Sequence, residues 1–452
     1  MKMTAAEIAQ ACGGTLLCGN PDTVISSVST DSRKIESDSL FVPIKGERTD
    51  AHDYIRATFI AGAVATLTQE HNRVNDSNVW ISVQSTELAL QQIACAYRKR
   101  FSIPFVGITG SVGKTSTKEM VALALSAGLN VMKTEGNFNS QVGLPLTMFR
   151  LSGAHQAAVI EMGMSNFGEM ERLAKIAAPD YAVVTNIGIS HIEQLKTQEN
   201  IRQEKLHITD RFHEGSILFL NGDDVLLSEL RGKLSAETVY FGTKPGCDFR
   251  ASDVMYEDGC TVFTLTVRNS VHRVKLPVLG MHNVLNALAG LAVAQTLGVP
   301  LEQAVKKLAE YKSPAMRQQI HRVKGITVID DSYNASPDAM RSSIEVLCSF
   351  HTGKRIAVLA DMLELGELSK SAHYGIGVNA AQSGVDLLIT VGSRAKDIAQ
   401  GARSVREDIR CCICDTNEEA EHELQSILAN GDIVLVKGSR GMHTDEIVKK
   451  LL

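Results

Sequence analysis

The residues with the clearest chemical meaning are a lysine and two hydroxyls that follow a glycine-rich turn. The β-branched run 106–109 predicts a buried strand, the turn 110–113 follows it, and a helix is expected to restart at Lys114. This order directs successive backbone N–H groups and a helix N-terminus toward a phosphate. Lys114 would reach the terminal phosphates of a nucleotide, and the Thr115 hydroxyl would join the shell of a Mg²⁺ ion.

The turn is a compact form of the phosphate-loop pattern, T-G-x-x-G-K-T-S. A glycine turn that only caps an ordinary helix is the alternative interpretation, but the strand in front and the Lys-Thr-Ser sequence behind favour phosphate binding. The residues expected to contact the nucleotide here are Gly110, Ser111, Val112, Gly113, Lys114, Thr115 and Ser116.

Two further side chains stand at the ends of predicted strands after this loop. Glu161 lies in the apolar run 157–162, and His191 comes just after the run 182–187. Ligands of parallel sheets bind outside the carboxyl ends of the strands, so a carboxylate, an imidazole and the Thr115 hydroxyl could together hold Mg²⁺. A hydrogen-bonded structural histidine and a structural ion pair are the alternatives.

The last third of the chain offers two more polar groups at strand ends. Asp331 follows the strand 326–330, and the basic turn 437–440 follows the apolar run 433–436. The basic turn is a candidate anion site, with a plain turn as the alternative. Lys205 lies in the predicted helix 199–212, and its spacing alone predicts that it belongs to a solvated helix face.

Composition limits the classes of function. The 452 residues are too many for one core and suggest about three domains. A formal charge of −5 leaves no basic field for nucleic acid or an anionic membrane surface. The N-terminus reads as a short amphipathic helix, no apolar run is long enough to span a membrane, and nine scattered cysteines fit a reducing cytoplasm.

The order of predicted elements gives an α/β fold with three domains. Residues 1–84 combine short strands and polar turns in an N-terminal α/β substrate domain. Residues 85–313 alternate strands and helices around the phosphate loop, which predicts a mostly parallel, P-loop ATPase-like sheet with an antiparallel addition. Residues 314–452 start a second alternation, a Rossmann-like doubly wound domain, after the polar segment 311–319, an expected hinge.

Taken together, these motifs resemble the Mur ligases, the ATP-dependent, amide-forming enzymes of peptidoglycan precursor synthesis. The resemblance covers essentially the whole chain. The segments that carry it are TDSR (30–33), KGERTDAH (45–52), GNFN (136–139), GMHNVLNA (280–287), DDSYNA (330–335), DMLELG (361–366) and KGSR (437–440), with the phosphate loop, Glu161 and His191.

The resemblance implies ATP as the nucleotide and Mg²⁺ as the metal. By it, the metal ligands are Thr115, Glu161, His191 and Lys205, the last as a carbamate formed with CO₂. Lys114 joins Glu161, His191 and Lys205 as catalytic residues. Asn283 would contact adenine, while Arg317 and Asp331 would close on ATP.

The resemblance also implies two small-molecule partners and a cytoplasmic enzyme, which we expect to be a monomer. It is strongest to the branch that joins D-alanyl-D-alanine (D-Ala-D-Ala) to UDP-N-acetylmuramoyl-tripeptide. The residues expected to bind these substrates are Thr30, Asp31, Ser32, Arg33, Lys45, Gly46, Asp50, His52, Asn137, Asn139, Tyr333, Asn334, Lys437, Ser439 and Arg440.

Two alternatives stay open at this point. One is a sister ligase of the same fold, such as the enzyme that adds the third residue or folylpolyglutamate synthase; the sequence lacks the Asp-Asn-Pro-Arg tetrapeptide typical of the diaminopimelate-adding branch. The other is a phosphate-loop switch that hydrolyses nucleotide to change shape. The motifs do not indicate whether the third residue of the peptide is diaminopimelate or lysine.

Overall fold

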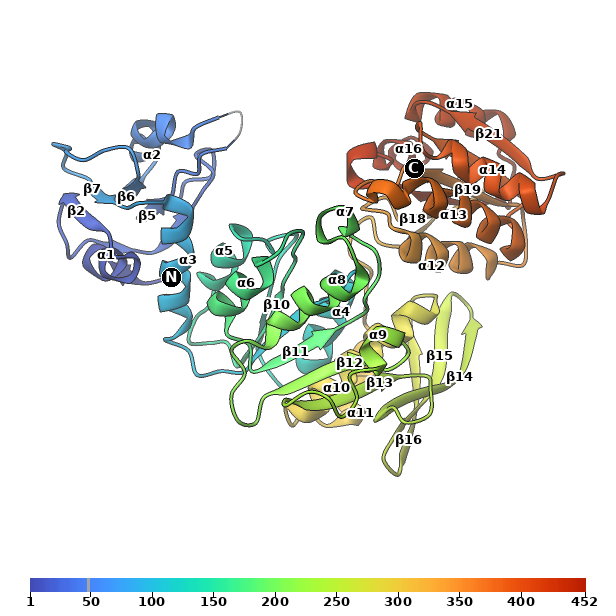
Figure 1. The fold of residues 1–452 in the computed structure, drawn as a ribbon, viewed down its shortest axis with the longest axis horizontal. Coiled ribbons are helices and arrows are strands. Elements are labelled where there is room, and N and C mark those ends of the chain that lie inside the picture. Colours follow the sequence, from blue (N-terminus) through green and yellow to red (C-terminus); the bar gives the residue numbers. More distant parts are fainter. Residues whose placement is uncertain (47–48) are drawn as a thin grey trace.

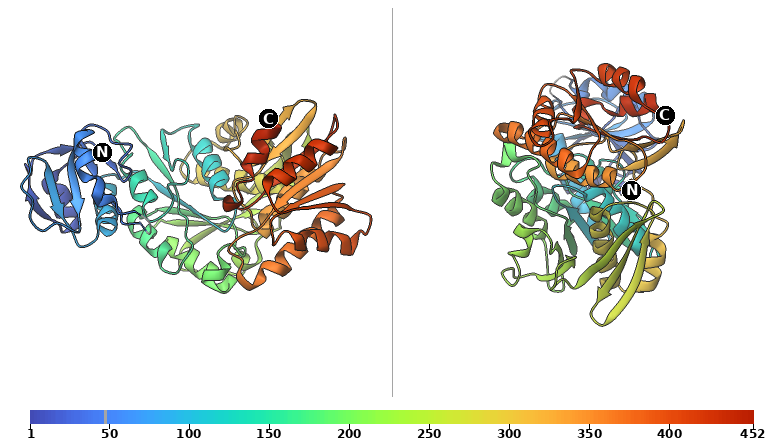
Figure 2. Two further views of the ribbon diagram at one scale, coloured as in Figure 1. Left: turned by 90° about the horizontal axis from the view of Figure 1, so that it is seen from above. Right: turned by 90° about the vertical axis from the view of Figure 1, so that its right-hand side faces the viewer.

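A computed structural model describes residues 1–46 and 49–452, and three large sheets dominate it. We call the parts built on the five-, nine- and six-stranded sheets the N-terminal, central and C-terminal domains. Figures 1 and 2 show the N-terminal domain (blue) and the C-terminal domain (orange to red) at opposite ends of the central domain. Glu47 and Arg48 of the KGERTDAH segment lie outside the described residues.

The N-terminal domain is a mixed sheet with the strand order β2-β7-β6-β5-β4, in which only β2 runs antiparallel to its neighbour. Helix α1 (Ala5–Cys12) begins at a capping box between Thr4 and Glu7 and ends at Gly13, whose φ is 61°. This is the glycine-closed helix that the sequence predicts. The other elements are β1 (Met3–Thr4), β2 (Thr15–Cys18), β3 (Val24–Ile25), β4 (Ser27–Ser29), β5 (Ser39–Phe41), α2 (Ile55–Ile60), β6 (Ala63–Thr68) and β7 (Val79–Ser82).

Helix α3 (Thr86–Arg98) joins the first two domains. It packs against α1 on one side and against α5 (Gly143–Met148) and α6 (Glu169–Ala177) on the other. One apolar core therefore runs from the N-terminal sheet across α3 to one face of the central sheet.

The central sheet has the strand order β16-β15-β14-β13-β12-β11-β8-β10-β9. The strands from β9 to β14 pair in parallel and β14, β15 and β16 pair antiparallel, as the sequence predicts for a mostly parallel sheet with an antiparallel addition. The strands are β8 (Phe105–Thr109), β9 (Val131–Lys133), β10 (Ala157–Glu161), β11 (Tyr181–Val184), β12 (Ile217–Asn221), β13 (Glu237–Gly242), β14 (Phe249–Glu257), β15 (Cys260–Val267) and β16 (Ser270–Leu276).

Helices cover both faces of this sheet. Helix α4 (Lys114–Leu125) packs on α10 (Met281–Thr296) and α11 (Leu301–Leu308) in a second apolar core, on the face opposite α3. The remaining short helices are α7 (Ile192–Leu195), α8 (Gln198–Leu206) and α9 (Val225–Ser228).

The C-terminal domain is a doubly wound sheet with the order β17-β18-β22-β19-β20-β21 and a core on each face. Five strands are parallel, and β17 joins antiparallel to β18. The elements are β17 (Gln319–Val323), β18 (Ile326–Asp330), α12 (Pro337–Cys348), β19 (Arg355–Ala360), α13 (Ser369–Ser383), β20 (Leu387–Val391), α14 (Lys396–Val405), β21 (Arg410–Cys414), α15 (Asn417–Ile427), β22 (Ile433–Lys437) and α16 (Asp445–Leu451).

The segment between α11 and β17 is the only covalent connection between the central and C-terminal domains. Met316 and Gln318 in this segment have φ angles of 59° and 50°, in the left-handed region. Within the described part of the chain, no helix has both the length and the apolar character needed to cross a bilayer.

Candidate functional site

Parallel pairing brings the phosphate loop and Glu161 to the same edge of the central sheet. Strand β8 lies between β10 and β11, with Glu161 opposite Ile108 and Val184 opposite Thr109 in the ladder. The chain therefore leaves all three strands at the same level. This is the edge at which the sequence predicts ligand binding.

Two residues that follow β11 hold the loop in shape. The Thr185 hydroxyl donates to the Val112 carbonyl (2.6 Å), and the Asn186 side chain both accepts from the Val112 N–H and donates to the Val112 carbonyl (2.9 Å each). Gly110 has a φ of 149°, and a Cβ atom there would lie 1.9 Å from Thr185 Oγ1. Glycine is required at this position because neither the conformation nor the space admits a side chain.

The loop amides divide into two groups. The N–H groups of Ser111 and Val112 donate to Asn186, so they serve the loop itself. Across the described residues, the N–H groups of Gly113, Lys114, Thr115 and Ser116 have no hydrogen-bond acceptor. These free donors surround the N-terminus of α4, where the helix dipole favours an anion.

Lys114 folds back over the loop. Its Nζ donates to the Gly110 carbonyl (2.8 Å). Burial lowers the pKa of Lys114, and the nearby Glu161 carboxylate opposes this shift.

Glu161 is a buried carboxylate with one oxygen bound and one free. Its Oε1 accepts from the Thr115 hydroxyl (3.1 Å) and from Asn139 Nδ2 (2.8 Å). Its Oε2 is buried without a hydrogen bond among the described residues, and the nearest ammonium, Lys118 Nζ, lies 3.8 Å away. Since a buried charged oxygen normally has a partner, Oε2 is available to a cation.

Lys205 is 1% exposed at the end of α8. Within the described part of the chain, its ammonium makes no ion pair and no hydrogen bond. Burial and the charge of Lys114 lower the pKa of Lys205 well below its usual range, against the smaller effect of Glu204. The amine is therefore neutral far more often than that of an exposed lysine.

His191 sits at the start of α7 and faces the C-terminal domain. Its Nδ1 lies 2.7 Å from Glu364 Oε2, in the turn after β19. The histidine lowers the pKa of the Glu364 carboxyl. The pair therefore joins the central domain to the C-terminal domain beside the cavity described next.

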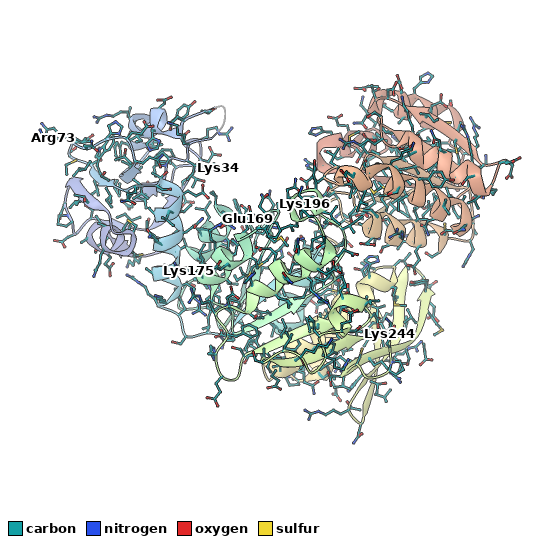
Figure 3. All side chains as sticks on the ribbon, in the orientation of Figure 1. Lys34, Arg73, Glu169, Lys175, Lys196 and Lys244 are labelled. Carbon is teal, nitrogen blue, oxygen red and sulfur yellow. The ribbon has the colours of Figure 1, made fainter. Side chains whose placement is uncertain are left out.

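A cavity of 740 Å³ connects the phosphate loop, Glu161 and His191 to the C-terminal domain, while Lys205 and Gly110 are not among its lining residues. Glu169 also lines it, and Figure 3 shows Glu169 on the side of the central domain nearer to the N-terminal domain, with Lys196 nearer to the C-terminal domain. The expected site residues that line the cavity are Ser111, Val112, Gly113, Lys114, Thr115, Ser116, Asn139, Glu161, His191, Asn283, Arg317, Asp331, Tyr333, Asn334 and Lys437. The structure thus assembles these residues from two domains that are far apart in the sequence.

The C-terminal wall of the cavity is organised around a buried ion pair. Lys437 Nζ lies 2.5 Å from Asp331 Oδ2 and also donates to the Asn334 carbonyl (3.0 Å). The Arg317 guanidinium stacks on the Tyr333 ring, 4.0 Å from its centroid. On the central side, Asn283 Nδ2 donates to the Leu279 carbonyl (2.8 Å). The same Nδ2 lies 3.5 Å from Oε1 of Gln318, which belongs to the segment between α11 and β17.

Other expected residues lie outside this cavity. Ser439 and Arg440 stabilise the C-terminal domain: the Ser439 Oγ accepts from the Leu363 N–H (2.9 Å), and Arg440 pairs with Asp445 (3.2 Å). Asn137 is exposed on the loop that carries Asn139.

The N-terminal candidates form two separate groups. Asp31 and Arg33 pair in the loop after β4, where the guanidinium lowers the pKa of Asp31 to about 2; Thr30 and Ser32 share that loop. Asp50 contacts His52 Nδ1 (2.6 Å) and Lys45 (3.1 Å), close to Gly46.

In residues 1–46 and 49–452, only one group of three potential metal ligands has its ligand atoms all within 4.8 Å of one another, namely Asp50, His52 and Glu70. Lys45 Nζ lies 3.2 Å from Glu70. A lysine ammonium therefore already pairs with both carboxylates of this cluster.

Sequence reasoning did not single out Asn186, Lys118 or Glu364 as site residues. Asn186 lies near the end of the predicted strand 182–187, a position that could have indicated a contact with the neighbouring loop. Glu364 was visible only as part of the DMLELG segment, and its contact with His191 depends on how two domains pack together.

Comparisons with known proteins agree with this arrangement. Three family models match the chain: the Mur ligase family catalytic domain over residues 24–98, the Mur ligase middle domain over residues 108–294, and the Mur ligase glutamate ligase domain over residues 316–440. A protein of Bacillus subtilis named UDP-N-acetylmuramoyl-tripeptide–D-alanyl-D-alanine ligase is 38% identical over 100% of this chain and 99% of its own length. This chain belongs to the Mur ligase family.

Solved Mur ligases share the whole architecture. MurF of Acinetobacter baumannii superposes with a TM-score of 0.92 at 30% identity and covers 100% of this chain and 99% of its own. MurF of Thermotoga maritima in complex with ADP has a TM-score of 0.83 at 32% identity, over 94% of this chain and 96% of its own. The three-domain α/β fold that the sequence predicts is confirmed.

Proposed function

We propose that this Mur ligase joins D-Ala-D-Ala to UDP-N-acetylmuramoyl-tripeptide, with hydrolysis of ATP to ADP and phosphate. The observation that carries the proposal is the single cavity that brings the phosphate loop together with Arg317, Asp331 and Lys437 of the third domain. Full-length similarity to ligases named for this reaction supports the choice of substrates.

The proposed reaction has two steps. A peptide carboxylate repels nucleophiles, so an oxygen of the tripeptide carboxylate first attacks the γ-phosphorus of ATP, and the bond to the ADP oxygen breaks. The product is an acyl phosphate. The amine of D-Ala-D-Ala then attacks the acyl carbon, loses a proton, and expels inorganic phosphate as the amide bond forms.

The residues of the phosphate loop suit the first step. Phosphoryl transfer depends mainly on positioning and charge neutralisation. The free N–H groups of residues 113–116 would hold the ATP phosphates, and the Lys114 ammonium would exchange its carbonyl partners for phosphate oxygens. Asn283 lines the cavity beside Gln318, and we propose that it contacts the adenine there.

The donor set around Glu161 fits Mg²⁺. Its buried Oε2, which accepts no hydrogen bond among the described residues and has only a 3.8 Å ion pair with Lys118, is a hard oxygen ligand beside the Thr115 hydroxyl, and His191 lines the same cavity. When bound, the ion would neutralise charge on the transferring phosphoryl group. The proposed metal ligands are Thr115, Glu161, His191 and a carbamylated Lys205.

Lys205 is suited to become a carbamate. Only a neutral amine attacks CO₂, and burial keeps the pKa of Lys205 low. The nitrogen would form a bond to the CO₂ carbon and lose a proton, which leaves an anionic carbamate. Such an anion would remove the repulsion from Lys114 and supply oxygen ligands to the metal.

The remaining site residues are proposed to bind the two substrates. Tyr333, Asn334, Lys437, Ser439 and Arg440 lie in the domain proposed to receive D-Ala-D-Ala, and Lys437 borders the cavity. For the UDP-sugar-peptide, we propose the two N-terminal groups and the loop that carries Asn137 and Asn139. The residues of the N-terminal groups are Thr30, Asp31, Ser32, Arg33, Lys45, Gly46, Asp50 and His52.

We also propose that the protein acts in the cytoplasm as a monomer. The nine cysteines are all unpaired, which suits a reducing compartment.

A phosphate-release assay tests the proposal. The purified chain is supplied with Mg²⁺ and ATP, with either the lysine- or the diaminopimelate-containing tripeptide, and with or without D-Ala-D-Ala. We expect phosphate release that requires both substrates, together with a pentapeptide product seen by mass spectrometry. Release that is the same without D-Ala-D-Ala would refute the ligase and favour a nucleotide switch.

A further inference from the structure

The contact between His191 and Glu364 links two domains at the proposed metal site. His191 belongs to the central domain and Glu364 to the C-terminal domain, 173 positions later in the chain. Nδ1 of His191 lies 2.7 Å from Oε2 of Glu364, an ion-pair contact that does not have the geometry of a hydrogen bond among the described residues. Both residues have left-handed backbone conformations, with φ angles of 63° and 61°. Such angles are costly for residues with a side chain and cluster at functional sites.

The turn that carries Glu364 is held rigidly by the C-terminal domain. The Met362 N–H donates to Nε2 of the buried His373 (2.9 Å), and the Leu363 N–H donates to the Ser439 Oγ (2.9 Å). Leu365, on the other side of Glu364, is 2% exposed in the core of the domain. Glu364 therefore projects from a turn that is fixed on both sides.

The same turn packs against the segment that follows His191. A Cβ atom on Gly366 would lie 3.4 Å from Glu193 Cβ, and the short 3₁₀ helix that Gly366 begins contacts α7. Ile189, two residues before His191, packs on the apolar core of the C-terminal domain. The approach of His191 and Glu364 thus requires the two domains to be docked as they are here.

Metal-binding histidines generally present one ring nitrogen to the ion and donate the other N–H to a carboxylate, which fixes the tautomer and the ring orientation. We infer that Glu364 is a positioning residue for His191: docking of the C-terminal domain places its carboxylate against Nδ1 and leaves Nε2 as the nitrogen that serves Mg²⁺. Domain docking therefore completes the metal site. This inference rests on the proposed function, because it requires His191 to serve a metal.

The test compares four variants of the full chain with the wild type: Glu364→Gln, Glu367→Gln, His191→Gln and the double variant that combines the first and third. Binding of a non-hydrolysable ATP analogue is followed by calorimetry over a series of Mg²⁺ concentrations. Glu364→Gln keeps the size of the side chain but removes its charge, and we expect half-maximal stimulation of binding to require about tenfold more Mg²⁺. Glu367→Gln, in the same turn region and exposed, is the matched control and should follow the wild-type curve.

Comparison of His191→Gln with the double variant distinguishes positioning from a general electrostatic effect. If Glu364 acts through His191, then adding Glu364→Gln to His191→Gln should cause no further shift. If wild-type binding depends on Mg²⁺ and the Glu364→Gln curve superimposes on it, this inference is overturned while the proposed metal site stands. The same conclusion follows if the shifts of the two single variants add up in the double variant. Wild-type binding that is indifferent to Mg²⁺ would overturn both this inference and the proposed metal site.

Discussion

Replacing Asn186 with alanine tests whether this side chain holds the phosphate loop in its binding shape. The side chain makes two hydrogen bonds to one residue: Oδ1 accepts from the Val112 N–H and Nδ2 donates to the Val112 carbonyl, both at 2.9 Å. Each bond contributes about 1 kcal/mol net. Loss of both should cost about 2 kcal/mol, which corresponds to about a 30-fold change in an equilibrium or rate ratio.

The loss should appear in ATP handling rather than as global unfolding. The main-chain bond from the Ser111 N–H to the Asn186 carbonyl survives the substitution, and so does the bond from Thr185 to the Val112 carbonyl. The loop should therefore stay close to its place while it samples other conformations. We expect kcat/KM for ATP to fall about 30-fold in the phosphate-release assay, with little change in kcat/KM for D-Ala-D-Ala.

Asn130→Ala is the matched control. Asn130 is an exposed asparagine just before β9, where its Nδ2 donates to the Ala154 carbonyl (2.9 Å), away from the loop. It should leave the ATP kinetics unchanged. An Asn186→Ala enzyme with wild-type kcat/KM for ATP would refute the reasoning, because the loop would then hold its shape without that side chain.

Three further variants test other parts of the site. Lys205→Ala should abolish turnover, and formate should partly restore it, since a small carboxylate can replace the carbamate. A wild-type turnover rate of this variant without formate would contradict the carbamate. Gly110→Ala should lower the free energy of unfolding by about 2 kcal/mol in urea titrations, because its Cβ would overlap Thr185 Oγ1 at 1.9 Å. An unchanged urea midpoint would contradict this clash. Lys437→Met should cost about 3 kcal/mol by the same measurement, because it leaves the buried Asp331 carboxylate unpaired. Equal stability of this variant and the wild type would show that Asp331 finds another partner.

Much of the fold could be predicted from the sequence because the central and C-terminal sheets are built from short apolar runs separated by helices. The strands predicted at 106–109 and 157–162 are observed as β8 (Phe105–Thr109) and β10 (Ala157–Glu161). Strand β17 was not predicted, because Gln319–Val323 contains polar residues and lies at a sheet edge. The helix predicted over 199–212 ends earlier, at Leu206, and continues only as a 3₁₀ turn.

The parts of the site that were predictable are those within one chain segment or one sheet edge. The strand, loop and Lys114 form a local pattern, and parallel topology places Glu161 beside it. The use of the Ser111 and Val112 amides by Asn186 was not predictable, because it depends on the side-chain conformation of a residue in another loop. Likewise, the low pKa of Lys205 follows from its burial, which an isolated helix pattern does not reveal.

The apolar core that crosses helix α3 has a consequence for how the molecule unfolds. Because the N-terminal sheet and one face of the central sheet share that core, neither can lose its packing without exposing apolar surface of the other. The C-terminal sheet has its own two cores, joined to the rest by one segment and the contacts around Leu279 and Ile189. We therefore expect the three large sheets to unfold as two cooperative units, and the unit expected to unfold independently is the one that brings Glu364 to the site.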